Sequence, residues 1–318
     1  MAAHDSSALA YVRHGQTPFF RLAQASVGDD GRADYAGADA VLLGVPYDGG
    51  TTYQSGARFA PYEVRRASAV IERYHPLHRL DVFSAIEVVD GGNVAFPPFD
   101  PGAVRAAIEA EVRAVLAADA APMLIGGDHS IALPALRAVH ARFGPVAVVH
   151  VDAHLDTSGP EVWGEEFHHG SPFRHAIAEG LIERGQLHQV GIRATTGSPE
   201  ADALSRAHGG LCVTASLLED RRLRAVVRDL CETIGDRPTY VSFDVDGVDP
   251  AFAPGTGTPV PGGLTSREAL ALLRGLAGTR VVGMDVVEIC PALDHAGLTS
   301  LLGAQVLFEG LALHALGR

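Results

Sequence analysis

The sequence predicts an α/β fold, a single three-layer α/β/α domain with a mainly parallel sheet. Two observations indicate this class. Short apolar runs alternate along the chain with longer segments of helical periodicity, which is the pattern of strand–helix–strand units. Several of these runs are nearly continuous in Val, Ile and Leu, as is typical of strands that helices cover on both faces.

Each predicted element follows from a local pattern. The helix that starts at Pro61 has proline in its first turn, where the missing N–H costs nothing. The first 39 residues are less regular, so we expect an N-terminal arm at 1–39 and one folded domain at 40–318. The predicted strands lie at residues 40–45, 86–90, 123–127, 146–152, 189–192, 240–243 and 281–287. The predicted helices lie at residues 61–74, 101–118, 130–143, 171–182, 216–234, 266–276 and 301–316.

Composition and charge exclude several classes of function. The 318 residues include 38 acidic and 25 basic side chains, a net charge of −13, which argues against nucleic acid as a partner. No lysine occurs, which excludes Schiff-base and P-loop lysine chemistry. We find no signal peptide and no uninterrupted apolar stretch of about 18 residues, so we expect no membrane partner. Three widely separated cysteines without a CxxC pair favour a cytoplasmic protein.

Acidic and imidazole side chains concentrate where four predicted strands end. The carboxyl ends of parallel strands lie along one edge of a sheet, and alternate residues of extended chain point to the same side. We therefore expect these side chains to converge. They are His129 after the strand at 123–127, Asp152 at the end of the strand at 146–152 with His154 and Asp156 after it, Asp244 and Asp246 after the strand at 240–243, and Glu288 after that at 281–287.

This concentration of carboxylates predicts a metal centre. Closely spaced carboxylates repel one another strongly unless a multivalent cation lies between them. Carboxylate and imidazole ligands without thiolate suit Mn²⁺, and also Fe²⁺, Ni²⁺ or Zn²⁺. Six such ligands are more than one ion usually takes from a protein, so we predict a dinuclear site with bridging carboxylates. The six are His129, Asp152, His154, Asp156, Asp244 and Asp246.

Other polar residues have structural explanations when taken alone. Asp249 precedes Pro250 and is predicted to be a turn residue. His168 and His169 would be solvated loop histidines. A structural role for Asp285 would place it on the opposite face of its strand, paired with an arginine.

Three segments together resemble the ureohydrolase superfamily, which includes arginase, agmatinase, guanidinobutyrase and proclavaminate amidinohydrolase. They are GGDHS at 126–130, DAHLD at 152–156 and SFDVDGVDP at 242–250. Shorter matches are GARF at 56–59, HGSPF at 169–173 and APGTGTP at 253–259. The resemblance runs from about residue 40 to the C-terminus. It implies an arginase-like fold with 40–318 as the catalytic domain.

The resemblance also implies a role for each matching position. It implies two Mn²⁺ ions per subunit, which share one water and lower its pKa. Glu288 would bind the guanidinium group, and His169 or Asp246 would deliver a proton to the leaving amine, giving urea and an amine. Trimers or hexamers are implied as well. The implied ligands are His129, Asp152, Asp156 and Asp244 for one ion, and Asp152, His154, Asp244 and Asp246 for the other, so that Asp152 and Asp244 bridge.

The sequence indicates the head group of the substrate more clearly than its tail. Where arginase has an asparagine that holds the amino-acid end, this chain has Ser158, and the segment 163–174 resembles agmatinase and proclavaminate amidinohydrolase. We therefore predict agmatine, cleaved to putrescine and urea. Guanidinobutyrase or another guanidino-acid hydrolase, proclavaminate amidinohydrolase and arginase are the alternatives, and a non-catalytic metal-binding homologue is the alternative from another class.

Overall fold

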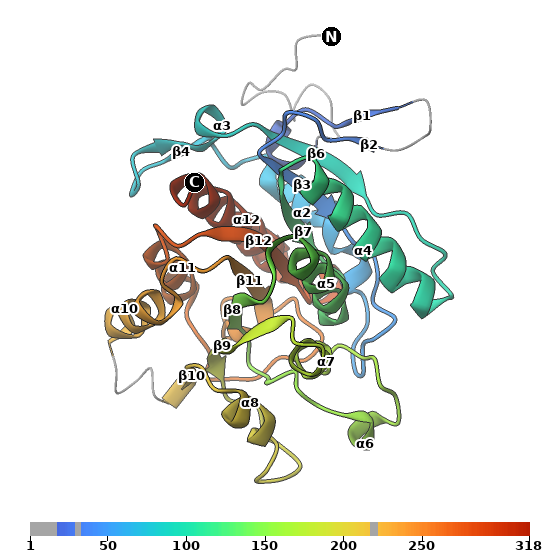
Figure 1. Ribbon diagram of the computed structural model, residues 1–318, viewed down its shortest axis with the longest axis vertical. Coiled ribbons are helices and arrows are strands. Elements are labelled where there is room, and N and C mark those ends of the chain that lie inside the picture. The colour runs from blue at the N-terminus through green and yellow to red at the C-terminus, as the bar shows by residue number, and fades with distance from the viewer. Residues whose placement is uncertain (1–17, 29–32, 217–221) are drawn as a thin grey trace.

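An all-parallel sheet forms the centre of the computed structural model, which describes residues 18–28, 33–216 and 222–318. Its eight strands lie in the order β10-β9-β8-β11-β12-β7-β3-β6 (Figure 1). This confirms the predicted α/β class. The sheet strands are β3 (Ala40–Gly44), β6 (Val88–Asn93), β7 (Ala121–Ile125), β8 (Val146–Val151), β9 (Ile182–Ile192), β10 (Cys212–Thr214), β11 (Thr239–Asp244) and β12 (Val281–Val287). Two short antiparallel pairs lie outside it, β1 (Ser26–Val27) with β2 (Ala33–Asp34) and β4 (Tyr74–His75) with β5 (Leu80–Asp81).

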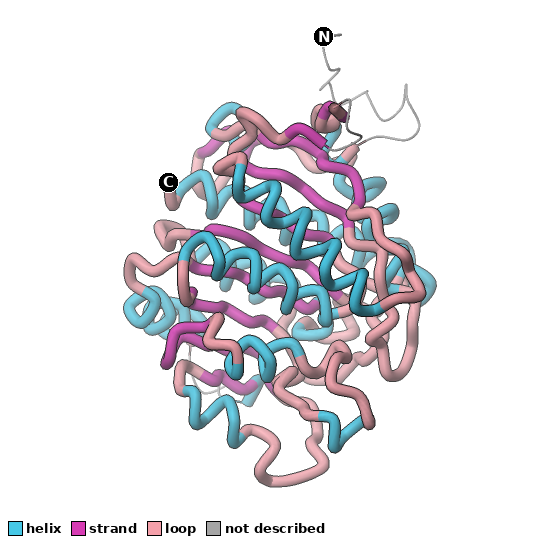
Figure 2. Tube along the Cα trace, turned by 45° about the vertical axis from the view of Figure 1, so that its right-hand side comes forward, coloured by secondary structure: helices cyan, strands magenta, loops and turns pink. Residues whose placement is uncertain are grey.

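Helices cover both faces of the sheet, as the continuous apolar strands require. On one face α4 packs against α5, and α5 packs against α7; Figure 2 shows helices lying over the strands on this side. On the other face α12 packs between α2 and α11, and α10 packs against α11. The helices are α2 (Ala60–Ser68), α3 (Val82–Ala85), α4 (Pro101–Ala117), α5 (Ala132–Phe143), α6 (Pro160–Trp163), α7 (Pro172–Ala178), α8 (Ala203–His208), α10 (Leu223–Ile234), α11 (Ser266–Gly275) and α12 (Leu298–Leu316).

Several element boundaries differ from the sequence prediction. The helix predicted at 171–182 ends at Ala178, because Gly180 has a φ of +70° that no helix continues, and β9 already begins at Ile182. The helix predicted at 61–74 ends at Ser68, and the residues after it include β4. The short edge strand β10 was not predicted, because three residues carry too little periodicity. Part of the helix predicted at 216–234 lies outside the described residues.

The apolar composition of α12 reflects its burial. The stretch His295–Leu316 has the length and hydropathy of a membrane span, but 72% of its apolar window is buried inside the protein. Helices that are apolar around their whole circumference are typical of a large protein core. Within the described chain this helix therefore serves as the central element of its layer.

The described end of the predicted arm packs into the main core. Phe19 and Phe20 are 0% and 2% exposed, and the Phe20 ring lies 6.2 Å from that of Phe308 in α12. The guanidinium carbon of Arg65 lies 4.2 Å from the centre of the Phe19 ring. The segment around Phe19 is thus part of the packed domain, although its sequence showed no regular pattern.

We expect Phe19→Ala to lower the free energy of unfolding by about 3–5 kcal/mol, because it empties a fully buried aromatic site. Phe99→Ala is the matched control, since Phe99 is 98% exposed; its effect should stay within about 0.5 kcal/mol. Denaturant unfolding of the two variants measures the difference. Equal stabilities would show that the segment does not belong to the core.

Candidate metal centre

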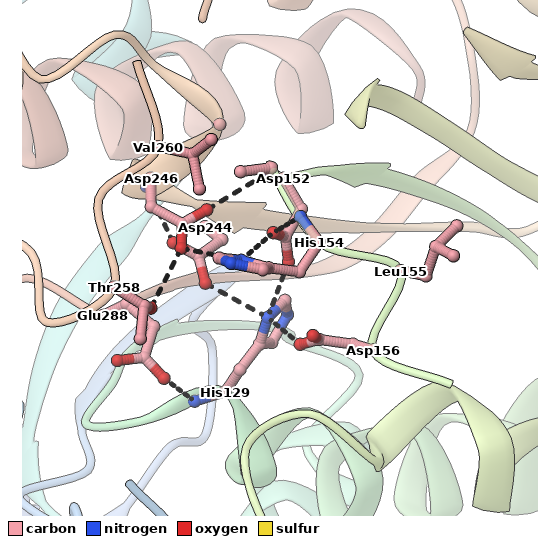
Figure 3. A network of polar contacts seen from close by, with 12 residues as sticks. His129, Asp152, His154, Leu155, Asp156, Asp244, Asp246, Thr258, Val260 and Glu288 are labelled. Atoms are coloured by element: carbon pink, nitrogen blue, oxygen red, sulfur yellow. Dashed lines mark hydrogen bonds and ion pairs between the residues drawn. The ribbon is translucent and has the colours of Figure 1, made fainter. Parts of the chain in front are cut away.

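The predicted site residues follow four strands that are neighbours in the sheet. The order β8-β11-β12-β7 places the carboxyl ends of these strands side by side, although they are far apart in sequence. Figure 3 shows the side chains that follow them converging on one region. The structure therefore brings together all six predicted ligands, with Glu288 beside them.

His129 is the centre of a first group of donors. Its Nδ1 atom lies 2.9 Å from Asp156 Oδ2, 3.2 Å from Asp152 Oδ2 and 3.3 Å from Asp244 Oδ2. All four side chains are buried, and His129 Nδ1 has no hydrogen-bond partner. A buried nitrogen lone pair surrounded by three carboxylates fits a divalent cation.

A second group of donors lies around His154. Its Nδ1 atom is 3.0 Å from Asp246 Oδ2 and 3.3 Å from Asp152 Oδ1. Asp152 thus offers one oxygen to each group, which is the geometry of a bridging carboxylate. The His154 side chain is 31% exposed, so this group is nearer to solvent than the first. Asp244 Oδ1 accepts the Asp246 amide at 2.8 Å, and its other oxygen, Oδ2, faces His129 in the first group.

The electrostatics of the two groups show the cost of crowding buried carboxylates. Burial first, and then the charges of Asp246 and Asp152, raise the pKa of Asp244 well above its ordinary value. Burial and Asp152 likewise raise the pKa of Asp246 to about 6. Burial alone would lower the pKa of His129, but the surrounding aspartates outweigh it and raise that pKa. In the absence of a metal ion, protons on Asp244, Asp246 and His129 therefore offset the negative charge that a bound cation would neutralise.

The backbone around the site is constrained by close approaches. A Cβ atom at Gly127 would lie 1.8 Å from the carbonyl oxygen of Tyr47, so only glycine fits there. Asp156 and Glu288 both have positive φ, at 51° and 63°, a conformation that costs non-glycine residues energy. The Glu288 amide donates to Gly127 O at 2.9 Å, which helps to hold it.

Glu288 and His169 form a buried pair next to the candidate metal ligands. Glu288 Oε1 accepts both the His129 amide and His169 Nδ1, each at 2.9 Å. His169 Nε2 contacts the hydroxyl of Thr52 at 2.7 Å. Burial would lower the pKa of His169, but the Glu288 charge and their hydrogen bond outweigh it and raise the pKa to about 9. His169 is therefore mostly protonated near neutral pH.

Some sequence expectations for single residues need correction. His168 and His169 are not solvated; their exposed fractions are 4% and 9%. Among the described residues Asp285 forms no ion pair with an arginine; it accepts hydrogen bonds from Tyr240 and Ser242. Asp249 is a turn residue as expected, because its carboxylate accepts the amides of residues 251, 262 and 263.

Sequence reasoning missed several side chains that touch the site. Thr258 Oγ1 lies 3.2 Å from Asp246 Oδ2, and His150 Nε2 lies 2.7 Å from Asp152 Oδ2. Thr52 and Ser242 contact the two site histidines, His169 and His129. His150 had a signal in the sequence, since it alternates with Asp152, but it lies inside an apolar run that was assigned to the core.

Comparisons with known proteins agree with this arrangement. The sequence model of the arginase family matches residues 38–312. Proclavaminate amidinohydrolase of Streptomyces clavuligerus is 45% identical over 87% of this chain and 90% of its own length. Guanidinopropionase of Pseudomonas aeruginosa is 43% identical over 89% and 88%. Agmatinase of Photorhabdus laumondii is 42% identical over 87% and 88%. The solved structure of the Streptomyces enzyme superimposes with a TM-score of 0.89 and 42% identity, covering 95% of this chain and 98% of that one.

Proposed function

Because this chain belongs to the arginase family, we propose that it is a binuclear manganese amidinohydrolase that cleaves a linear guanidino compound to urea and an amine. The observation that carries the proposal is the pair of donor groups that share Asp152 through its two oxygens. Carboxylate and imidazole donors without thiolate favour Mn²⁺ among the divalent ions. The ligands would be His129, Asp152, Asp156 and Asp244 for one ion, and Asp152, His154, Asp244 and Asp246 for the other.

The side chains around the metal ligands suit the other needs of the reaction. Two bound cations would lower the pKa of a shared water and so supply a nucleophile near neutral pH. Glu288 Oε2 has no hydrogen bond in the described structure, so it is open to the substrate guanidinium. Glu288 Oε1 already accepts two hydrogen bonds. For both carboxylate oxygens to bind the guanidinium, His169 must give up its hydrogen bond to Oε1. His169, protonated near neutral pH, can then give its proton to the departing amine, with Asp246 as the alternative donor.

We propose agmatine as the substrate. Three glutamates, Glu161, Glu165 and Glu166, are exposed in the loop between Asp156 and His169, and they favour a cationic tail electrostatically. Ser158 has no side-chain amide, unlike the asparagine of arginase at this position, to bind an α-carboxylate. Agmatinases are among the relatives at 40% identity or above.

A guanidino acid is the second candidate, and Arg174 is the observation that favours it. Arg174 lies at the start of α7, with its guanidinium carbon 2.8 Å from the position of a Cβ on Gly159. Glu161 Oε2 lies 2.2 Å from the same position, so the Glu161 carboxylate is beside this guanidinium and an acidic tail would compete with it. Relatives named for guanidino acids, such as guanidinopropionase, match at a similar identity.

Measuring kcat/KM side by side for agmatine, arginine and 4-guanidinobutyrate tests this choice. We expect agmatine to exceed arginine by at least about ten- to hundredfold, since one partly buried tail contact contributes about 1–3 kcal/mol. Activity should disappear with a chelator and return with Mn²⁺. A preference for 4-guanidinobutyrate would assign the tail to Arg174, and a preference for arginine would show that Ser158 was misinterpreted.

We also propose that the protein works in the cytoplasm as a trimer or hexamer. The three cysteines are free in the structure, which suits a reducing compartment. Sedimentation at micromolar concentration would measure the association.

A further inference from the structure

A row of buried polar side chains crosses four strands of the sheet just below the metal ligands. Gln189 in β9 pairs in register with His150 in β8, His150 pairs with Ser242 in β11, and Ser242 pairs with Asp285 in β12. Their exposed fractions are 0–1%. Asp152 and Asp244 lie two residues beyond His150 and Ser242, so they project from the same face of the sheet.

One half of the row determines which nitrogen of His150 carries its proton. The side-chain amide of Gln189 contacts both the Leu155 carbonyl, at 2.8 Å, and His150 Nδ1, at 3.0 Å. A backbone carbonyl only accepts, so the contacting atom is the NH₂ group, and His150 Nδ1 must accept from it. His150 Nε2 therefore carries the proton and donates to Asp152 Oδ2 at 2.7 Å. With a proton on this nitrogen, His150 does not ligate a metal but orients the bridging carboxylate.

The other half of the row does the same for His129. Tyr240 and Ser242 donate their hydroxyl protons to the two oxygens of Asp285, at 2.8 and 2.7 Å. With its proton directed to Asp285, Ser242 Oγ accepts from His129 Nε2, which lies 2.8 Å away. The proton of His129 is thereby held at Nε2, and the Nδ1 lone pair faces Asp152, Asp156 and Asp244.

We propose that this polar row positions two metal ligands, with Asp285 and Ser242 setting the tautomer of His129, and Gln189 and His150 orienting Asp152. The inference rests on the proposed metal site and assigns a role to residues outside the predicted ligand set. A buried polar row in an otherwise apolar sheet is costly unless its groups are hydrogen-bonded. In this row only Gln189 Oε1 has no partner in the described structure, and the row's bonds include those to His129 and Asp152. Outer hydrogen bonds of this kind typically change metal affinity by about 10- to 100-fold.

The test is Mn²⁺ binding to Ser242→Ala, measured by equilibrium dialysis and electron paramagnetic resonance on metal-free protein. We expect the affinity for one of the two ions to fall about 10- to 100-fold, while the other ion binds more nearly as in the parent. Ser68→Ala is the matched control. Ser68 is also fully buried and its hydroxyl makes two hydrogen bonds, but it lies in α2 away from the site. This variant should bind both ions with parent affinity.

The outcomes separate this inference from the proposed function. A folded Ser242→Ala that binds both ions as tightly as the parent overturns the positioning role and leaves the dinuclear site intact. Should Ser242→Ala not fold, Tyr240→Phe decides, since it removes one of the two bonds that hold Asp285: weaker binding of one ion supports the role, and unchanged binding overturns it. A parent protein that binds fewer than two ions contradicts the proposed function and this inference together.

Discussion

Asp244→Asn should abolish activity and at the same time make the metal-free protein more stable. Loss of a bridging carboxylate should lower metal occupancy and reduce turnover at least about a thousandfold, because lowering the pKa of water contributes several kcal/mol and about 1.4 kcal/mol is tenfold in rate. In the metal-free protein the Asp244 carboxylate is buried next to two like charges, and its pKa is raised. Replacing Asp244 with the neutral asparagine removes this unfavourable charge and should therefore raise the free energy of unfolding of the metal-free protein.

The pH dependence of stability gives the sign of this effect. A carboxylate whose pKa is raised on folding binds protons more readily in the folded state, so its contribution weakens stability as pH rises above the ordinary pKa of about 4. The parent without metal should therefore lose stability with rising pH more steeply than Asp244→Asn. Thermal unfolding with and without Mn²⁺, together with metal analysis, measures both parts.

Asp249→Asn is the matched control for this variant. Asp249 belongs to the same motif but accepts turn amides rather than facing the donor groups. It should keep both ions and most of the activity. An Asp244→Asn protein that retains two ions and full turnover would rule out the bridging role.

His169→Ala should lower turnover about 10²- to 10⁴-fold, the usual contribution of a positioned proton donor, without loss of manganese. His169 contacts Glu288 and Thr52, and within the described residues it makes no hydrogen bond to any of the six predicted ligands. Metal content measured beside kcat separates the two roles. Loss of manganese in this variant would show that His169 supports the metal site instead.

The pH profile provides a second check on His169. Its pKa of about 9 means that the proton-donating form is present at neutral pH and is lost as pH rises through 9. In the parent, kcat/KM should therefore fall near pH 9, and this falling limb should be absent in His169→Ala. The fall in kcat should occur at a lower pH than the fall in kcat/KM. In the substrate complex the bound guanidinium offsets the negative charge of Glu288, which raises the pKa of His169 in the free enzyme. A parent profile that stays flat through pH 10 would contradict the assignment.

The strands and the candidate ligand residues that follow them were predictable because their signals are local. Val146–Val151 is an uninterrupted apolar strand, and the alternation from Asp152 to Asp156 directly after it needs only the geometry of extended chain. The end of α7 was predicted wrongly, because the apolar residues around Ile182 fit a helix as well as a strand. Phe19, in the segment 1–39, has no local signal for burial, because the residues that bury it, such as Arg65, lie farther along the chain.

The sequence by itself determined the parallel α/β class and the residues that supply two imidazoles and four carboxylates, because periodicity and spacing are properties of short segments. Only the tertiary structure decided that β8, β11, β12 and β7 are neighbours, and so which residues share a row. The link from Asp285 through Ser242 to His129 joins residues that are up to 156 positions apart. Such register depends on how both helical layers pack on the sheet, and no local pattern along one strand encodes its neighbour.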